Sequence, residues 1–592
     1  MPDTPQPTPV SFSEFEPLTT AAWQERIRRD LKGADLASLE WHTPEGFTVQ
    51  PFYHREALEN LGQQPVPQAQ GAPTWLNVPT YHVPAADHGH TLIDQAADAL
   101  ARGADGVYFV LADAATFDVT YLSARLPLAT TYIGYSLKSA GLDLVQRLLA
   151  TGATTLRGFL QYDPITNHTP NLASQLSELR QVLRLTRAMP QFRGLSLHID
   201  NFGNCGATAT QQLAFALSTA AAYLSELSDA ELSVVDVAAT MQVHVAINPS
   251  YFIELTKLRA LRRLWATLLH AYQLPPAGAA SLTIFASTAS WSKTTLDSHT
   301  NLLRVTTETM AAVLGGADAV SVGTFDSLYE APNEFSARIA RNLPIILREE
   351  SGLNRVADPA AGSYYLETLT DELAREAWSL FQRIQAAGGL PSATRLVVQE
   401  LHEAAQAQFR RIAAGEQVVV GTNRFQNAQE QFSFNPKRLL RSKEFDTTRA
   451  TYPSEVLRLA TVMHFQRRER RRKRAAVVLL GPHTNQHIME SFMRTLPKEE
   501  RPELAAAHPV GTLSVLFSSP EEATLMYATP EQFNAFARTI CRVDPEDPSF
   551  AAPTLLSADL ATLQEAVQFF GFQEFTVNGY STEEVLARLQ GK

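Results

Sequence analysis

The run GVYFVLAD, at residues 106–113, is apolar almost throughout and ends on an aspartate. Runs of the same kind recur before and after it, separated by segments with helical periodicity: PTWLNVPTY (73–81), TYIGYSL (131–137), LRGFLQYD (156–163), GLSLHID (194–200), MQVHVAIN (241–248), LTIFAST (282–288) and DAVSVGTF (318–325). Apolar strands that alternate with helices are typical of a parallel sheet covered on its outside. Eight of them over about 250 residues predict an α/β fold built on a closed (β/α)8 barrel, with the open doubly wound sheet as the competing architecture.

The composition sets limits on function. The 592 residues are 45% hydrophobic and 19% charged, which is typical of a globular protein with more than one domain. With 50 Lys and Arg against 61 Asp and Glu, the net charge of −11 disfavours a nucleic-acid partner. The basic run QRRERRRKR (466–474) is therefore interpreted as a solvated or partner-contacting helix face.

Cysteine usage and the N-terminus bear on location. Only Cys205 and Cys541 occur, which predicts neither a disulfide framework nor a cysteine metal cluster and fits a reducing compartment. The start of the chain, MPDTPQPTPV, is unlike a signal peptide, and no stretch of eighteen apolar residues follows. We expect a cytoplasmic protein that does not span a membrane.

The pattern of runs divides the chain into four parts. We expect an N-terminal arm with a subunit interface (1–72), the barrel with its trailing helices (73–414), a linker (415–474) and a smaller α/β domain (475–592). In this last part four more runs read as strands, which predicts a flavodoxin-like open sheet: AAVVLLG (475–481), GTLSVLFSS (511–519), APTLLS (552–557) and EFTVNGY (574–580).

Polar residues end several predicted strands, where a barrel builds its site: Asp113, Asp163, Asp200, Asn201, Asn248, Ser287 and Asp326. The alternative is that they are turn and capping residues. His198 and Asp200 share one strand face and could form an acid–base pair or belong to the core. The D-x-H of Asp297 and His299, near Lys293, lacks a third ligand, so no metal site is expected. Phosphate-loop, zincin and hydrolase motifs are absent from the sequence.

Long segments resemble the methylmalonyl-CoA mutase family of cobalamin-dependent acyl-CoA mutases. They are WHTPEGFTVQPFY (41–53), GATATQQLAFAL (206–217), FIELTKLRALRRLWA (252–266), STASWSKTTLDSHTNLLRVTTETMAAVLGGADAV (287–320), FSARIARNLPIILREESGLNRVADPAAGSYYLE (335–367) and AWSLFQRIQAAGG (377–389). The resemblance implies a substrate barrel threaded by coenzyme A, followed by a degenerate domain of the cobalamin-binding type. In active members of the family adenosylcobalamin supplies the radical.

This chain departs from the family pattern at three places. Asp200 and Asn201 stand where catalytic members carry a Tyr-His pair. Thr80 stands where they carry a Tyr, with Leu76 and Val78 in place of polar and basic contacts and Tyr81 one position off. His483, Asn485 and Ile488 replace the Asp, His and Gly of the D-x-H-x-x-G cobalt-ligand motif, although a local shift would let His483 or His487 ligate. We interpret these positions as vestigial and expect no catalytic, cofactor-binding or metal-binding residue on this chain.

The resemblance with these losses implies the small, non-catalytic subunit of a heterodimeric methylmalonyl-CoA mutase. Its partner would be the catalytic large subunit, which would hold the acyl-CoA substrate and adenosylcobalamin. Trp23, Trp41, Phe52 and Tyr53 in the arm are candidate interface anchors or, equally, local core. Two alternatives are an active acyl-CoA mutase of altered substrate and a free-standing binding or assembly protein for a mutase.

Overall fold

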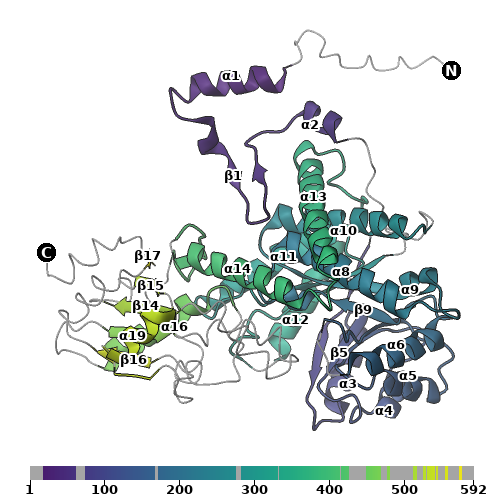
Figure 1. Ribbon diagram of the computed structural model, residues 1–592. Coiled ribbons are helices and arrows are strands. Elements are labelled where there is room, and N and C mark those ends of the chain that lie inside the picture. Colours follow the sequence, from purple (N-terminus) through teal and green to yellow (C-terminus); the bar gives the residue numbers. More distant parts are fainter. Residues whose placement is uncertain are drawn as a thin grey trace, which may run out of the picture.

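A computed structural model describes most of the first 425 residues and short pieces beyond them. The described residues are 18–61, 74–166, 171–274, 282–330, 333–413, 415–425, 449–467, 476–480, 511–516, 524–528, 530–539, 542–544, 554–557 and 573–576. They form an α/β fold with parallel sheets in the first part of the chain (Figure 1).

All eight predicted strand runs of residues 73–325 contain strands. They form two five-stranded parallel sheets, ordered β4-β5-β6-β7-β8 and β3-β12-β11-β10-β9. The first sheet comprises β4 (Thr80–Val83), β5 (Gly106–Leu111), β6 (Tyr132–Ser136), β7 (Gly158–Gln161) and β8 (Phe192–Arg193). The second comprises β3 (Leu76–Asn77), β9 (Leu195–His198), β10 (Met241–Ile247), β11 (Thr283–Thr288) and β12 (Ala319–Ser321).

The two sheets meet at two short joints. Residues 78 and 79 separate β3 from β4, and Gly194 alone separates β8 from β9. At the first joint the backbone bonds to both sides, since Val78 N donates to Val320 O and Tyr108 N donates to Pro79 O, both at 2.9 Å. The sheets are therefore continuous in the chain at these joints.

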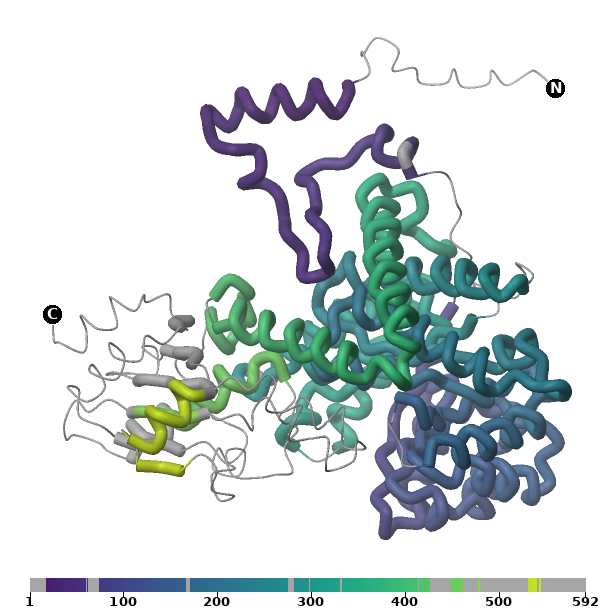
Figure 2. The backbone as a smooth tube through the Cα atoms, viewed as in Figure 1, coloured from purple at the N-terminus to yellow at the C-terminus, as the bar shows by residue number. Residues whose placement is uncertain are grey.

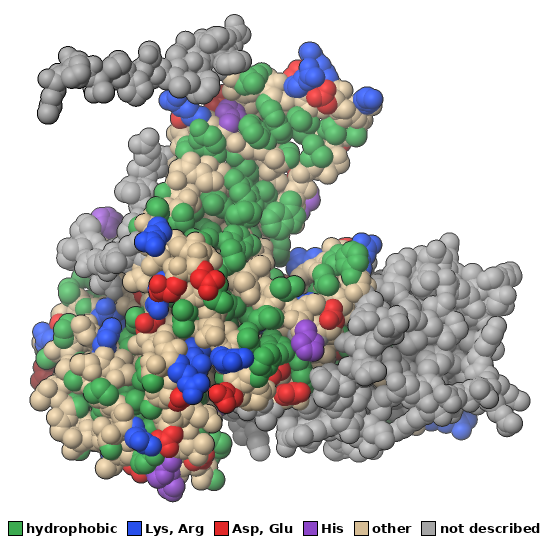
Figure 3. Space-filling model, turned by 180° about the vertical axis from the view of Figure 1, so that it is seen from behind, with side chains coloured by type: hydrophobic (Ala, Val, Ile, Leu, Met, Phe, Trp, Pro, Cys, Tyr) green, Lys and Arg blue, Asp and Glu red, His purple; other side chains and the backbone are tan. Residues whose placement is uncertain are grey.

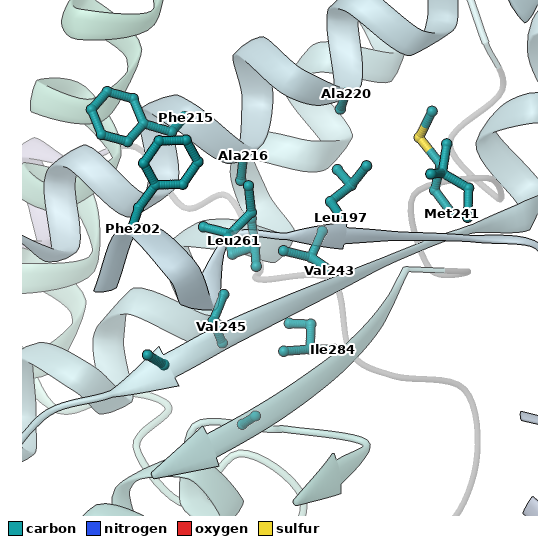
Figure 4. Close-up of a cluster of buried hydrophobic side chains, with 14 of the residues drawn as sticks. Leu197, Phe202, Phe215, Ala216, Ala220, Met241, Val243, Val245, Leu261 and Ile284 are labelled. Atoms are coloured by element: carbon teal, nitrogen blue, oxygen red, sulfur yellow. The ribbon is translucent and has the colours of Figure 1, made fainter. Parts of the chain in front are cut away.

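Side chains alternate along each strand between two environments, as the pleat requires. Val243 and Val245 of β10 belong to the large hydrophobic core, whereas Gln242 and His244 lie on the opposite face. Figure 4 shows the helix-facing set, in which Leu197, Val243 and Ile284 of three neighbouring strands point toward the helices that carry Ala216 and Leu261. Because both faces are buried, the strands read as continuous apolar runs.

Helices follow the strands and cover the outer faces of the sheets (Figure 1). They are α3 (His90–Ala101), α4 (Val119–Arg125), α5 (Gly141–Ala150), α6 (Leu172–Thr186), α7 (Asp200–Gly203), α8 (Ala209–Leu227), α9 (Val234–Thr240), α10 (Tyr251–Ala271), α11 (Asn301–Leu314) and α12 (Glu334–Glu349). Two long helices, α13 (Tyr364–Ala386) and α14 (Thr394–Ala413), follow, where trailing helices were expected. Within the described part of the chain, no helix combines the length and hydropathy needed to cross a bilayer.

Helix α10 tests one sequence prediction in detail. The capping alternative for Asn248 was wrong by two residues, because the helix begins at Tyr251 with Ser250 at the N-cap. The predicted apolar stripe is buried from Leu255 to Leu268. The basic residues are also buried, because Arg259 pairs with Asp358 at 2.9 Å and Arg262 pairs with Asp318 at 2.9 Å.

The N-terminal arm comprises α1 (Thr20–Asp30), the 3-10 helix η1 (Leu36–Leu39), β1 (Trp41–His42), β2 (Thr48–Val49) and α2 (Arg55–Asn60). Strands β1 and β2 pair antiparallel and form a hairpin. The tube in Figure 2 shows this arm projecting from the body, with the hairpin tip reaching back toward it. There Glu45 accepts from Thr210 N at 2.8 Å, which anchors the tip at the start of α8.

The C-terminal strands correct the expected flavodoxin-like architecture. The described strands are β13 (Ala476–Leu480), β14 (Gly511–Leu516), β15 (Thr524–Ala528), β16 (Thr554–Ser557) and β17 (Gln573–Thr576), with helices α16 (Tyr452–Arg467) before them and α19 (Pro530–Thr539) among them. In the order β16-β13-β14-β15-β17, the four pairings between neighbouring described strands are antiparallel. A flavodoxin-like sheet is parallel, so the expectation was wrong for these strands. The extra strand β15 was also missed.

Candidate functional site

A polar cluster lies on the inner face of the second sheet, at the ends of β9 and β10. His198 is the last residue of β9 and stands in register beside His244 of β10. Asp200 begins the short helix α7 directly after β9. The cluster is therefore formed by the neighbouring strands β9 and β10 and by the short helix α7 that follows β9.

Short distances connect the three side chains. His198 Nε2 lies 3.4 Å from Asp200 Oδ1, and His244 Nδ1 lies 3.2 Å from the same oxygen. The predicted approach of His198 and Asp200 is therefore confirmed, although Asp200 lies on α7 and not within the strand. His244 was not among the predicted site residues.

Outer polar groups surround this cluster. Gln161 of β7 places its Oε1 3.0 Å from His244 Nδ1, and Tyr108 Oη donates to the same Oε1 at 2.8 Å. On the other side, Ser287 Oγ lies 2.9 Å from His244 Nε2. These bonds hold the His244 ring from both of its nitrogens.

Burial favours the uncharged form of every titratable member. It lowers the pKa of His198 to about 3, with the charge of Lys138 as a second cause. It lowers the pKa of His244 well below its usual range and raises that of Asp200 well above. Both imidazoles are therefore neutral at neutral pH, and each keeps one nitrogen lone pair.

The predicted vestigial residues Asn201 and Thr80 lie in different surroundings. The Asn201 side-chain amide contacts His198 Nδ1, so it belongs to the edge of the cluster. Thr80, the first residue of β4, instead places its Oγ1 2.7 Å from Oγ of Ser321, the last residue of β12. Of the neighbouring departures, Val78 is fully buried and Leu76 is half-buried.

The other strand-end residues have structural roles, which favours the capping interpretation for them. Asp163 is fully buried and accepts from Tyr223 Oη at 2.5 Å and from His198 N at 2.8 Å. Exposed Asp113 accepts from Ala115 N in a turn. Asp326 accepts from Asn333 Nδ2 at 2.7 Å. Asn248 is the exception, because it precedes α10 without capping it and its buried Oδ1 has no hydrogen-bond partner among the described residues.

The D-x-H segment does not form a site in the described structure. Lys293 is buried and paired with Glu308 at 2.6 Å. Asp297 accepts Thr300 N through its backbone carbonyl, and exposed His299 packs near Phe325 at 5.7 Å between ring centroids. The C-terminal positions His483, Asn485 and Ile488, and also His487, lie outside the described residues.

Aromatic rings occupy the inner face beside the polar cluster. Tyr108 and Phe159 of one sheet pack against Phe285 of the other, with ring centroids 5.4 and 5.0 Å from it. Tyr132, Val78 and Ala319 complete this inner cluster. We call these six residues the aromatic plug. It joins the inner faces of the two sheets.

Gly134 shows how tightly the aromatic plug is packed. A Cβ at this position would lie 2.4 Å from the Phe159 ring and 2.9 Å from the Tyr108 ring. The absence of a side chain in β6 therefore makes room for the two rings. The plug was missed from the sequence because its residues look like ordinary strand residues, and only their shared face brings them together.

Comparisons with known proteins match this chain to one enzyme family. The family model described as Methylmalonyl-CoA mutase matches residues 127–470. The methylmalonyl-CoA mutase small subunit of Porphyromonas gingivalis is 33% identical over 444 residues, covering 71% of each chain. Methylmalonyl-CoA mutase of Cereibacter sphaeroides is 30% identical, covering 69% of this chain and 64% of its own length. The mitochondrial enzyme of Bos taurus is 28% identical, with coverages of 69% and 61%.

These matches define the class of protein: an α/β chain of a mutase-type enzyme family. The chain belongs to the methylmalonyl-CoA mutase family. It spans less than two thirds of the length of the Cereibacter and Bos relatives. The expected family is thereby confirmed.

Proposed function

We propose that this chain is the small, non-catalytic subunit of a heterodimeric, adenosylcobalamin-dependent methylmalonyl-CoA mutase. In this proposal the partner large subunit carries the isomerisation of methylmalonyl-CoA to succinyl-CoA. The 33% identity to a protein named as a small subunit supports this assignment. The proposal includes the cytoplasmic location expected from the cysteine content.

The proposed function requires that the two sheets form a closed barrel. We infer that the two sheets form one closed eight-stranded barrel over residues 73–414, in which β3 with β4 and β8 with β9 each count as one strand. The bonds of Val78 and Tyr108 at the first joint, and the break of a single residue at Gly194, support closure. The aromatic plug then lies on the barrel axis.

The aromatic plug is the observation that carries the proposal. In active members of the family, coenzyme A threads the barrel. Here Tyr108, Phe159 and Phe285 pack ring against ring between the two sheets. Phe159 and Phe285 are fully buried and Tyr108 is 4% exposed, so a pantetheine chain would have to displace them. Displacing close-packed rings costs several kcal/mol each, about 3–5 by comparison with Phe→Ala substitutions.

The residues at the catalytic positions support the same conclusion. Asp200 is buried within a hydrogen-bonded cluster, and burial favours its protonated form. Thr80 pairs with Ser321. Neither position offers the phenol or imidazole that the family resemblance implies there. An active mutase of altered substrate would have to use this neutral cluster and move the aromatic plug.

Adenosylcobalamin is proposed to reside on the partner. The described C-terminal strands pair antiparallel, which does not match the parallel sheet expected of a cobalamin-type domain. The residues of this chain therefore do not fit the cofactor in the way the family motif implies.

The arm is the proposed interface with the large subunit. Trp41 and Phe52 are 45% and 46% exposed, and Trp23 stacks on Phe52 at 4.8 Å between ring centroids. Figure 3 shows hydrophobic side chains gathered along the upper projection of the molecule. Exposed aromatic residues of this kind are enriched at interface hot spots. Tyr53 differs, since its ring packs near Tyr365 at 5.8 Å and its hydroxyl accepts from Gln50 N.

Calorimetric titration of coenzyme A into the purified chain tests the proposal. We expect no saturable binding to this chain alone, and saturable binding to the catalytic large subunit titrated in parallel. Stoichiometric binding of coenzyme A to this chain would contradict the proposal, because it would require an open path through the barrel.

A further inference from the structure

We propose that His198, Asp200 and His244 bind one divalent transition-metal ion, and that Zn²⁺ fits this ligand set best. This site is additional to the proposed subunit role and does not depend on it. Among the described residues, these three form a group whose ligand atoms all lie within 4.8 Å of one another. Two imidazoles and one carboxylate are a common ligand set for Zn²⁺ and Fe²⁺.

The distances suit a first-row ion. Zn–N and Zn–O bonds of about 2.0–2.1 Å in a tetrahedral site place neighbouring ligand atoms about 3.3 Å apart. Asp200 Oδ1 lies 3.4 Å from His198 Nε2 and 3.2 Å from His244 Nδ1, so two edges already have this length. Small rotations of the side chains would place an ion between the three atoms.

The backbone holds the ligands in place. Asp163 accepts from His198 N at 2.8 Å, which fixes the end of β9. Gly203 lets α7 approach β10, because a Cβ there would lie 2.7 Å from the Ala246 Cβ and 3.0 Å from Gln212. Asp200 therefore reaches His244 from a rigid element and not from a loop. Such support favours metal binding over an accidental approach.

Outer groups set the ring orientations. Without an ion, the 3.0 Å contact with Gln161 Oε1 places a proton on His244 Nδ1. Metal binding would move the proton to Nε2, where it can be donated to Ser287 Oγ at 2.9 Å, and would leave the Nδ1 lone pair free to ligate. The amide nitrogen of Asn201 contacts His198 Nδ1, and turning the Asn201 carboxamide over would present its oxygen to Nδ1–H and leave Nε2 to ligate. Metal-binding histidines almost always have such outer partners. Gln161 Oε1, 3.0 Å from His244 Nδ1, offers a further oxygen.

The site has an open and a closed side. The side chain of His198 keeps 19% of its surface exposed, whereas that of His244 keeps 3%. Behind His244, the Phe285 ring centroid lies 4.5 Å away and belongs to the aromatic plug. An ion would enter past His198, and one coordination position would remain for water on that side.

Metal titration of the full-length chain tests the proposal without any activity measurement. After treatment with a chelator, the chain is titrated with Zn²⁺ by calorimetry and with Co²⁺ by visible absorption. We expect one ion per chain and the d–d bands of four- or five-coordinate Co²⁺. His244→Gln and Asp200→Asn should each weaken binding by more than the roughly 10- to 100-fold typical of an outer-shell loss. Ser287→Ala should weaken it by about 10-fold.

His90→Gln is the matched control, because His90 Nε2 pairs with Asp118 at 2.8 Å on the surface. This variant should bind like the wild type. If His244→Gln does not fold, as judged by circular dichroism, His198→Gln at the more open side replaces it. The proposal is overturned if the wild type binds no stoichiometric metal, or if folded His198→Gln and Asp200→Asn both retain wild-type affinity. The three residues would then be a hydrogen-bonded core cluster.

Discussion

Phe159 and Phe285 come from different sheets, yet their ring centroids lie 5.0 Å apart and both side chains are fully buried. Each ring fills space between the two sheets. The contact therefore contributes to stability as a core contact does, and in the proposed barrel it also excludes substrate.

Phe159→Ala should lower the free energy of unfolding by about 3–5 kcal/mol, because it leaves a cavity against Tyr108 and Phe285. Phe252→Ala is the control, since Phe252 is 46% exposed and its loss should cost about 0.5 kcal/mol. Denaturant unfolding of both variants measures the difference. Equal, small losses would mean that the aromatic plug is not packed as described.

Glu254 of α10 gives a pH prediction. Burial raises its pKa from 4.5 to about 7, against the opposing effect of Lys257, while Glu45 raises it further. The folded chain therefore holds this proton more tightly than the unfolded chain does. The stabilisation is complete below about pH 4.5 and is lost as the pH rises through 7.

Glu254→Gln keeps the neutral shape at every pH. We expect the melting temperature of the wild type to fall relative to this variant between pH 5 and pH 8, measured by thermal unfolding across the range about the pKa of 7. Glu59→Gln, on the exposed end of α2, should show no such trend. A wild-type curve parallel to that of Glu254→Gln would contradict the assigned pKa shift.

The residues differ in how far the sequence could predict them. Period two along a strand predicted that His198 and Asp200 lie together, and they are 3.4 Å apart, but the reason was wrong because β9 ends at His198 and Asp200 begins α7. His244 lies on another strand and meets Asp200 only through the β9–β10 register, which no local pattern encodes. A polar residue at an inner position of an apolar run, such as His244 or Gln161, was the one available signal.

Among the elements, the hairpin of β1 and β2 connects the arm to the body. Its tip carries Glu45, which is buried and accepts from Thr210 N, while Thr210 Oγ1 donates to the Glu45 carbonyl oxygen at 2.9 Å. The hairpin itself could be predicted from its sequence. Its docking site could not, because it joins residues 165 positions apart.

Glu45→Ala should loosen the arm from α8. Hydrogen bonds to a charged or buried carboxyl group contribute about 1.5–3 kcal/mol, so the undocked population should rise by more than about 10-fold. Limited proteolysis within residues 18–61 measures this change. Glu59→Ala, which removes only the exposed pair with Arg55, should leave the cleavage rate unchanged. Equal cleavage of both variants would contradict the anchoring role of Glu45.

Two examples show why the local sequence does not predict where a helix begins or how strands pair. Asn248 and Ser250 are both good caps, and the path of the chain after β10 selects Ser250. In the C-terminal part, short apolar runs predicted strands at the right places but not their direction. Strand direction depends on the connections between strands, and it is set by tertiary packing rather than by the runs themselves.

At the scale of the whole molecule, the arm exposes Trp41 and Phe52, the proposed contact with the large subunit. Trp41→Ala and Phe52→Ala should each weaken association with the large subunit by about 2 kcal/mol, or roughly 30-fold, as interface anchors do. Surface plasmon resonance with immobilised large subunit measures this. Leu185→Ala, which removes an exposed apolar side chain from α6, should leave the affinity unchanged. Unaltered binding by both arm variants would place the interface elsewhere.

The proposal that the large subunit alone carries catalysis is tested most directly by mutase turnover. Turnover is measured for the purified chain alone and for the chain together with the large subunit. Both samples receive methylmalonyl-CoA and adenosylcobalamin. We predict no succinyl-CoA from the chain alone and sustained formation from the pair. Formation of succinyl-CoA by the chain alone would contradict the proposal, and would make Asp200 and Asn201 the first candidates for catalytic residues.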